Sequence, residues 1–200
     1  MIKRLMQSVR QYKRPAIATP ILVTGEVIIE VLIPFVTAQL IDAINGGAQM
    51  PEILKAGALL LALALISLAF GTLAGITCSR AAAGFAKNLR QDMFYNIQTF
   101  SFATIDKFST PSLVTRMTTD VTNVQMSFMM IIRTAIRAPM IIIFAMVMAF
   151  SMAGSLAWIY VYVTIPLAFG LFFVIRKVLP IFRRVFRKYD ALNESVEENV

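Results

Sequence analysis

The chain has 200 residues, with 19 Lys and Arg against 11 Asp and Glu, so its net charge is +8. Hydrophobic residues make up 58% of it and charged residues 15%, and the mean hydropathy is +0.73. A soluble domain carries about 25% charged residues, and disorder requires low hydrophobicity, so both classes are excluded. A nucleic-acid-binding protein is disfavoured, because its positive charge lies on a polar surface. The composition predicts an integral membrane protein in contact with lipid, with no nucleic-acid partner.

The first 14 residues are basic, and the apolar stretch behind them, from Pro15 to Ile41, is charged only at Glu26 and Glu30. A signal peptide is disfavoured, because this stretch is longer than a signal core and contains no small-residue cleavage site. We expect an amphipathic cytoplasmic arm followed by a first span at about 15–41.

A turn at Asn45-Gly46-Gly47 precedes a second apolar stretch, in which residues 56–79 carry no charge. At 1.5 Å per residue they form about 36 Å of helix, which is enough to cross a bilayer. The second span is placed at about 53–79. Apolar residues then recur every three or four positions as far as Phe100, which predicts one helix from about 53 to 102. Cys78 lies in it, and we expect a buried, inert thiol.

This helix is expected to break at 103–111, where Ser109 or Thr110 caps the next helix and Pro111 is its first residue. Residues 80–126 then form a helical hairpin outside the membrane. Residues 138–175 carry no charge and are too many for one span. We therefore expect a third span at about 127–152, a turn at 153–155 and a fourth span at about 156–176.

Basic residues indicate which side each segment occupies. Five lie in the first 14 residues, one in the first connection, seven from 80 to 137, none in the second turn and six from 176 to 188. By the positive-inside rule, both ends and the hairpin are cytoplasmic. The predicted fold is all-α: a polytopic membrane bundle of four long spanning helices with cytoplasmic extensions. Leu192, Val196 and Val200 repeat every four residues, which predicts that the last helix continues in a longer protein.

Residues 100–121 (FSFATIDKFSTPSLVTRMTTDV) resemble the first intracellular loop of ATP-binding cassette (ABC) exporters, particularly bacterial multidrug-type half-transporters. Residues 132–139 (IRTAIRAP) and 189–194 (YDALNE) resemble the same subgroup. The resemblance implies six spanning helices followed by a nucleotide-binding domain, of which this chain, as a single region 1–200, matches the first four helices. It also implies a homo- or heterodimer of half-transporters in the bacterial inner membrane.

No phosphate loop of the form G-x-x-x-x-G-K-[ST] occurs in the chain. The resemblance therefore implies that ATP and Mg²⁺ bind the nucleotide-binding domain and that this chain holds no cofactor. The chain also has no His, which excludes His-based metal sites and a Ser-His-Asp triad. We expect no catalytic residue and no metal site, and whether the chain is part of an enzyme is left open.

The resemblance assigns the hairpin tip to the first coupling helix, which rests on the ATP-binding domains. Phe108 would be its anchor, since aromatic residues dominate interface energetics; a solvated turn is the alternative. The candidate coupling residues are Thr104, Ile105, Asp106, Lys107, Phe108 and Ser109.

Four charges in the apolar segments are candidates for a substrate pathway or an intramembrane charge pair. Glu26 and Glu30 share a face of the first helix, and Arg133 and Arg137 share a face of the third. Charges in a span face a protein interior or a wet cavity, although arginines also extend to the interface. Glu26 and Arg137 each lie 15 residues before the expected outer helix ends at Ile41 and Met152, so both are about 22 Å deep. We expect these two residues to pair; otherwise the glutamates would contact a cationic substrate.

The sequence thus predicts the membrane-spanning part of an ATP-driven exporter, contributing to the substrate pathway and to coupling. The alternative is a membrane scaffold or signalling protein whose long cytoplasmic helices bind a partner. A channel is disfavoured, because no selectivity filter is recognisable.

Overall fold

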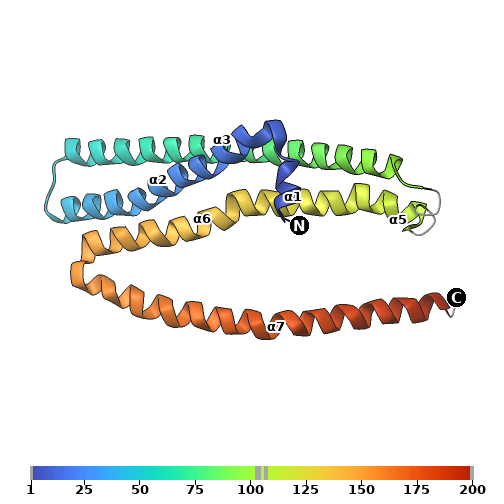
Figure 1. The fold of residues 1–200 in the computed structure, drawn as a ribbon. Helices are drawn as coiled ribbons and strands as arrows, with labels where there is room; N and C mark the ends of the chain where they lie inside the picture. Colours follow the sequence, from blue (N-terminus) through green and yellow to red (C-terminus); the bar gives the residue numbers. More distant parts are fainter. Residues whose placement is uncertain (1, 102–104, 106–107, 199–200) are drawn as a thin grey trace. The chain divides into compact units, whose positions relative to one another are not determined.

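A computed structural model describes residues 2–101, 105 and 108–198, and these residues contain helices and turns but no strand. This confirms the all-helical fold (Figure 1). Four helices are long: α2 (Lys13–Asn45), α3 (Met50–Gln98), α6 (Val121–Ala153) and α7 (Trp158–Glu198). The short elements are α1 (Ile2–Gln7), η1 (Arg10–Tyr12), α5 (Thr110–Thr115), η2 (Arg116–Asp120) and η3 (Gly154–Ala157).

The helices belong to two compact units, Met1–Met148 and Ala149–Val200. The first unit contains the N-terminal segment, α2, α3, the hairpin and most of α6. The second contains the end of α6, η3 and α7. The residues that form the candidate site all lie in the first unit.

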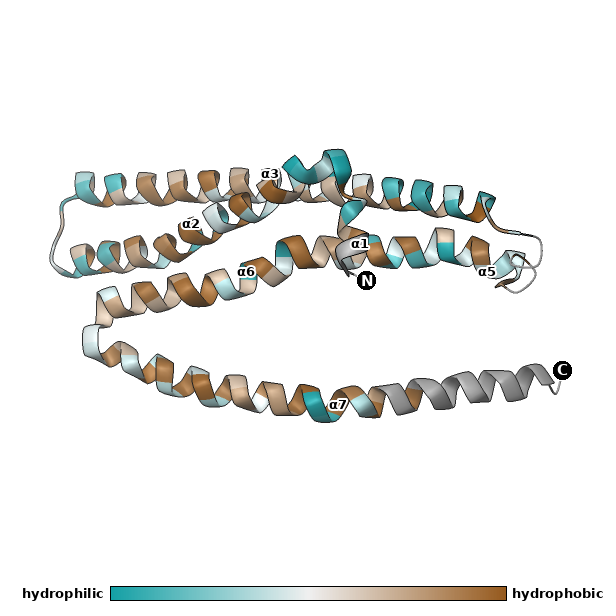
Figure 2. Cartoon of the chain, viewed as in Figure 1, coloured by the Kyte–Doolittle hydropathy of each residue, from teal (hydrophilic) through white to brown (hydrophobic). Residues whose placement is uncertain are grey.

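Helix α3 has 49 residues and begins close to its predicted start, with a proline and an acidic residue, Glu52, in its first turn. Both features favour a helix N-terminus, because proline needs no hydrogen-bond partner there and the carboxylate complements the helix dipole. At 1.5 Å per residue α3 is about 74 Å long, more than twice the thickness of a hydrocarbon core. Apolar residues dominate its first half, and polar residues become frequent in its second (Figure 2).

The first unit is held together by two groups of buried apolar side chains. One contains Val23 and Val27 of α2 and Ala74 of α3, with Met140 and Phe144 of α6 packed against it. The other joins α3 to α6 and to the N-terminal segment, and consists of Val9, Cys78, Ala81, Ala82, Phe85, Phe128 and Ile132. The alanines allow the helix backbones to approach closely, as small residues do in membrane bundles.

The N-terminal segment is docked on α3 rather than free. The carboxylate of Asp92 accepts a hydrogen bond from the Ser8 hydroxyl at 2.9 Å and forms an ion pair with Arg10 at 2.6 Å. The buried amide of Asn88 donates to the backbone carbonyl of Ser8 at 2.8 Å. The sequence predicted an arm here, but not these contacts.

Three stretches of the described residues are long and apolar enough to cross a membrane: Arg10–Asn45, Met50–Gln98 and Thr110–Phe182. The third contains both α6 and the first part of α7, which η3 separates. Gly154 has φ +54°, a left-handed conformation that glycine adopts without strain. The turn therefore forms where it was predicted, although α7 begins at Trp158, two residues later than expected. The helix continues through Pro166.

Candidate functional site: an intramembrane charge cluster and a helical hairpin

The charge cluster consists of Glu26 and Glu30 on α2 and Arg133 and Arg137 on α6. The Arg137 guanidinium contacts both carboxylates, through Nη1 to Glu26 Oε1 at 3.0 Å and through Nη2 to Glu30 Oε1 at 2.6 Å. The two glutamates are one helical turn apart, so one planar guanidinium spans both of them. The structure thus brings together the Glu26–Arg137 pair expected from sequence and adds Glu30 to it.

Glu26 is buried, with only 8% of the residue exposed. Its Oε2 atom is inaccessible and has no hydrogen-bond partner among the described residues. Gly71 of α3 makes room for this carboxylate, because a Cβ at that position would lie 2.9 Å from Glu26 Oε1. A buried charge of this kind is tolerated only when an opposite charge compensates it, and Arg137 does so.

An open pocket of about 620 Å³ adjoins the cluster, and we call it the charge-cluster pocket. Its polar lining comes from three helices and its apolar lining from two: Glu26, Glu30, Ile33, Ala64, Ser67, Leu68, Gly71, Thr72 and Arg133. Within the part of the chain that the structure describes, Arg133 has no carboxylate oxygen within 4.0 Å. The pocket therefore presents charges of both signs to whatever enters it.

The described residues of the hairpin tip pack against the hairpin itself. Phe108 stacks on Phe100 with the ring centroids 6.2 Å apart, and the Arg116 guanidinium lies 5.3 Å from the Phe108 centroid. Phe108 and Ile105 are half-buried. Three candidate coupling residues, Thr104, Asp106 and Lys107, lie outside the described residues.

The expectation that Ser109 or Thr110 caps this helix is met in position but not in hydrogen bonding. Ser109 occupies the N-cap position of α5, and a proline lies in the first turn as predicted, but the Ser109 side chain makes no cap hydrogen bond. Its φ of +57° is uncommon for a residue with a side chain. The backbone carbonyl of Ser109 accepts the first hydrogen bond of the helix, from the Leu113 N–H at 3.2 Å.

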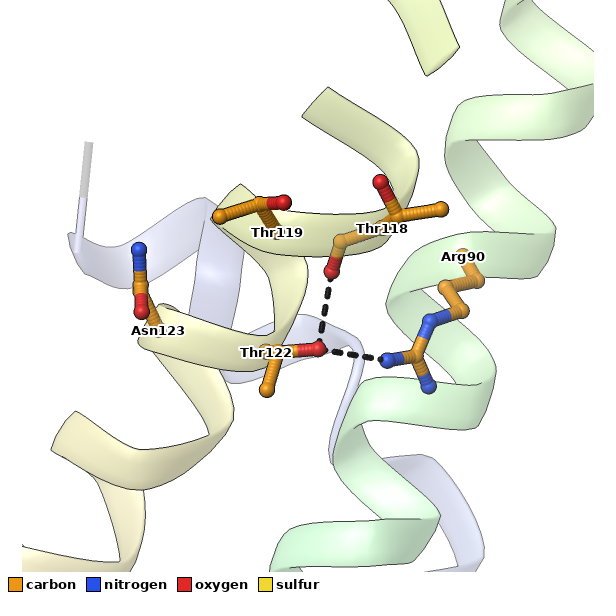
Figure 3. A pocket seen from close by; sticks show the side chains of 5 residues that line it. All are labelled: Arg90, Thr118, Thr119, Thr122 and Asn123. Carbon is orange, nitrogen blue, oxygen red and sulfur yellow. Dashed lines mark hydrogen bonds between the residues drawn. The ribbon is translucent and has the colours of Figure 1, made fainter. Parts of the chain in front are cut away.

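Beyond α5, the helix widens into a π-helix at η2, Arg116–Asp120. Arg90 of α3 reaches across to this turn: its Nε donates to the Met117 carbonyl at 3.3 Å and its Nη2 to the Thr122 hydroxyl at 3.1 Å. The Thr122 hydroxyl in turn donates to the Thr118 carbonyl at 2.8 Å (Figure 3). One side chain thus ties the two arms of the hairpin together.

Around Arg90 lies a second open pocket of about 400 Å³, which also contains Thr118, Thr119, Thr122 and Asn123. Sequence reasoning missed this arrangement. A signal was present in the cluster of threonines at 115–122, because β-branched residues lower helix propensity. Single-turn π-helices are frequent at functional sites.

Comparison with known proteins gives one consistent result. The family described as "ABC transporter transmembrane region" matches residues 17–200. The uncharacterized ABC transporter ATP-binding protein YfiB of Bacillus subtilis is 30% identical over 200 residues, which are 100% of this chain and 35% of that protein. The uncharacterized ABC transporter ATP-binding protein Rv1273c of Mycobacterium tuberculosis is 27% identical over 201 residues, 100% of this chain and 34% of that protein.

A more distant relative, the putative ABC transporter ATP-binding protein MG014 of Mycoplasma genitalium, is 29% identical over 139 residues, 69% of this chain and 22% of that protein. The chain thus spans about a third of the length of the two more similar relatives. The family match covers the charge cluster, the long α3 helix and the hairpin alike. The chain therefore belongs to the family of ABC transporter transmembrane regions.

Proposed function

We propose that this chain is the membrane-spanning part of an ATP-driven exporter, in which it forms part of the substrate pathway and presents the first coupling loop to a nucleotide-binding domain. One observation carries the proposal. Helix α3 lines the charge-cluster pocket at residues 64–72 and continues unbroken to Gln98, next to the hairpin tip. A single helix therefore connects a pocket among apolar helices to a loop far outside them.

The partners follow from this role. A nucleotide-binding domain that holds ATP and Mg²⁺ docks on the hairpin tip, the remaining spanning helices complete the pathway, and a second half-transporter, identical or different, completes the transporter. The relatives' names include "ATP-binding protein", which supports an ATP-dependent motor. The distribution of basic residues supports a cytoplasmic N-terminus and a cytoplasmic hairpin. The membrane of this proposal is the inner membrane of a bacterium.

The charge cluster is the proposed polar part of the pathway. Arg137 neutralises one carboxylate charge, so Glu26, Glu30 and Arg133 leave the pocket able to attract polar groups of either sign. Its apolar lining suits the hydrocarbon part of an amphipathic substrate. This chain's residues position and release the substrate and perform no bond chemistry.

The test is ATP hydrolysis by the complete polypeptide. It is purified with an N-terminal tag and reconstituted in vesicles, and vanadate-sensitive hydrolysis is measured with and without candidate amphipathic compounds. We expect hydrolysis that a transported compound stimulates. Absence of any hydrolysis from folded, monodisperse preparations of the polypeptide, both alone and with any half-transporter that co-purifies with it, would reject the exporter and favour the membrane scaffold.

Phe108→Ala tests the coupling part of the proposal. Loss of an anchoring aromatic weakens an interface by about 2 kcal/mol, so we expect compound-stimulated hydrolysis and transport to fall about tenfold or more. Phe94→Ala is the matched control, because Phe94 is an aromatic of the same hairpin that is 50% exposed. Equal effects of the two changes, or full transport by Phe108→Ala at normal expression, would remove Phe108 from the coupling contact.

A further inference from the structure

A third pocket lies where the N-terminal segment meets α3, and we call it the interface pocket. It has a volume of about 520 Å³ and is lined by Tyr12, Pro15, Thr77, Arg80, Ala83, Gly84 and Lys87. Arg80 is the first charged residue after the uncharged stretch 56–79. The pocket therefore lies where α3 passes from hydrocarbon to the polar headgroup region. Figure 2 shows the N-terminal segment beside α3 at this change in hydropathy.

Two cations of the interface pocket have no anion beside them among the residues that the structure describes. Arg80 and Lys87 are exposed and lie seven residues apart, so they share one face of α3. No carboxylate oxygen of the described residues is within 4.0 Å of either of them. Arg10 of the neighbouring segment, by contrast, is paired with Asp92 at 2.6 Å. The pocket thus offers two unneutralised positive charges to a ligand.

The walls of the interface pocket are fixed by contacts within the chain. The Tyr12 ring lies directly over Gly84, where any Cβ would collide with it. The Thr77 hydroxyl donates to the Leu73 carbonyl at 2.9 Å and lies 3.0 Å from the Thr19 hydroxyl of α2. Together with the docking of Ser8 and Arg10 on Asp92, these contacts hold the two sides of the pocket in place.

Toward the apolar end of α3, the same helix face becomes hydrophobic. Ile76 is four residues before Arg80 and 43% exposed, and Leu73 is four residues before Thr77 and 50% exposed. Ile17 of α2 is 63% exposed. A ligand that fills the pocket and follows this face needs an anionic head and an apolar tail.

We propose that the interface pocket binds the phosphate group of an anionic phospholipid. Arg80 and Lys87 contact the phosphate oxygens, Tyr12 lies at the headgroup level, and an acyl chain lies along Leu73 and Ile76. Basic pockets at the membrane surface of spanning helices bind anionic headgroups for these reasons of charge and position. The proposal rests on the membrane location of the chain and not on its transport activity. A bound lipid would link the docked N-terminal segment to α3.

The test measures phosphatidylglycerol bound to the purified complete polypeptide by native mass spectrometry, with phosphatidylcholine as the neutral comparison. We expect each of Arg80→Gln and Lys87→Gln to lower phosphatidylglycerol affinity about fivefold and the double variant about thirtyfold. The matched control is Lys13→Gln with Arg14→Gln, which removes the same charge from exposed neighbours outside the pocket. It should leave tight binding of the first phosphatidylglycerol unchanged.

Three outcomes would overturn the proposal. Equal losses in the pocket and control variants would show unspecific attraction to the bilayer. Unchanged phosphatidylglycerol binding by the pocket variants would exclude the site. If inorganic phosphate displaced the lipid at concentrations close to the lipid's own dissociation constant, the pocket would be assigned to a free anion. Circular dichroism checks that each variant is folded, and the single changes at exposed positions provide the measurement if the double variant unfolds.

Discussion

Glu26 places a carboxylate among apolar helices, and among the described residues Arg137 supplies the cation within 4.0 Å of it. An unpaired charge at the centre of a bilayer costs about 3 kcal/mol on insertion scales. The pairing therefore offsets a cost rather than adding stability beyond that of an apolar core. Arg137 serves two carboxylates, so its removal leaves more uncompensated charge than removal of either glutamate.

We expect Arg137→Gln to lower the free energy of unfolding by about 3 kcal/mol and Glu26→Gln by less, because Glu30 still occupies Arg137 in the second variant. The double variant should be more stable than the sum of the single effects predicts, with a coupling energy of about 1–3 kcal/mol. Thermal unfolding in detergent measures these values. Lys87→Gln combined with Glu26→Gln is the control and should be additive within about 0.5 kcal/mol, because Lys87 lies 16 residues along α3 from Gly71, the neighbour of Glu26, which is about 24 Å of helix. Additive effects for Glu26 and Arg137 would contradict the pairing.

Two glycines of α3 provide a matched test of the space around Glu26. Ala raises helix propensity by about 1 kcal/mol over Gly at both positions. A Cβ at Gly75 would meet Arg133 Nη1 at an ordinary 3.6 Å, whereas one at Gly71 would lie 2.9 Å from Glu26 Oε1. We expect Gly75→Ala to raise the melting temperature and Gly71→Ala to lower it. A higher melting temperature for both variants would show that Glu26 moves aside without loss.

At the scale of the elements, the hairpin depends on contacts between its two arms. Arg90 contacts a backbone carbonyl and a hydroxyl of the other arm, at and just beyond the π-helix η2. A π-turn contains one residue more than an α-helical turn. Without that extra residue, every later residue of the helix would be rotated by about 100°. Arg90 therefore helps to fix which face of α6 points toward α2 and α3.

We expect Arg90→Gln to increase hydrogen exchange of the backbone amides in residues 114–124 by about thirtyfold, since two hydrogen bonds of roughly 1 kcal/mol each are lost. Arg90→Lys should show nearly the same increase, because an ammonium does not reproduce the fork of the guanidinium. Asn123→Ala is the control, because Asn123 lines the same pocket whereas the hydrogen bonds of Arg90 go to Met117 and Thr122. Unchanged exchange in Arg90→Gln would show that η2 forms independently of α3.

At the scale of the whole molecule, sequence patterns predicted the long helices well because they depend on local information. Apolar stretches and turn residues placed α3 within a few residues of its ends and α7 within two residues of its start. Matching depths predicted that Glu26 and Arg137 would be neighbours. The participation of Glu30 depends on the rotation of α2, which depth alone does not specify.

The contacts that sequence reasoning missed all join residues far apart in the chain. The docking of Ser8 and Arg10 on Asp92 spans more than 80 residues, and the contact of Arg90 with Met117 spans 27. No periodicity within one helix reports such partners. Ser109 occupies the N-cap position that its residue type favours, but its backbone is in the left-handed region and its side chain makes no cap hydrogen bond, which the residue type alone does not predict.

The proposed topology is testable with single cysteines in a Cys78→Ala background. We expect Tyr95→Cys, at an exposed hairpin position, to react with an impermeant maleimide only after the cells are opened. Gln49→Cys, at an exposed position between α2 and α3, should react in intact cells, which makes it the control for reagent access. Labelling of Tyr95→Cys from outside would reverse the orientation deduced from the basic residues.

The distribution of proline gives α3 mechanical properties that the other long helices lack. Helix α2 contains Pro20 and Pro34, α6 contains Pro139, and α7 contains Pro166 and Pro180, whereas α3 has its proline only in the first turn. Sharp bends in helices occur mainly at prolines. We therefore expect α2, α6 and α7 to flex at fixed points and α3 to move as one stiff rod. A force applied to its polar end is then transmitted to the helix wall beside Glu26 with little loss in bending.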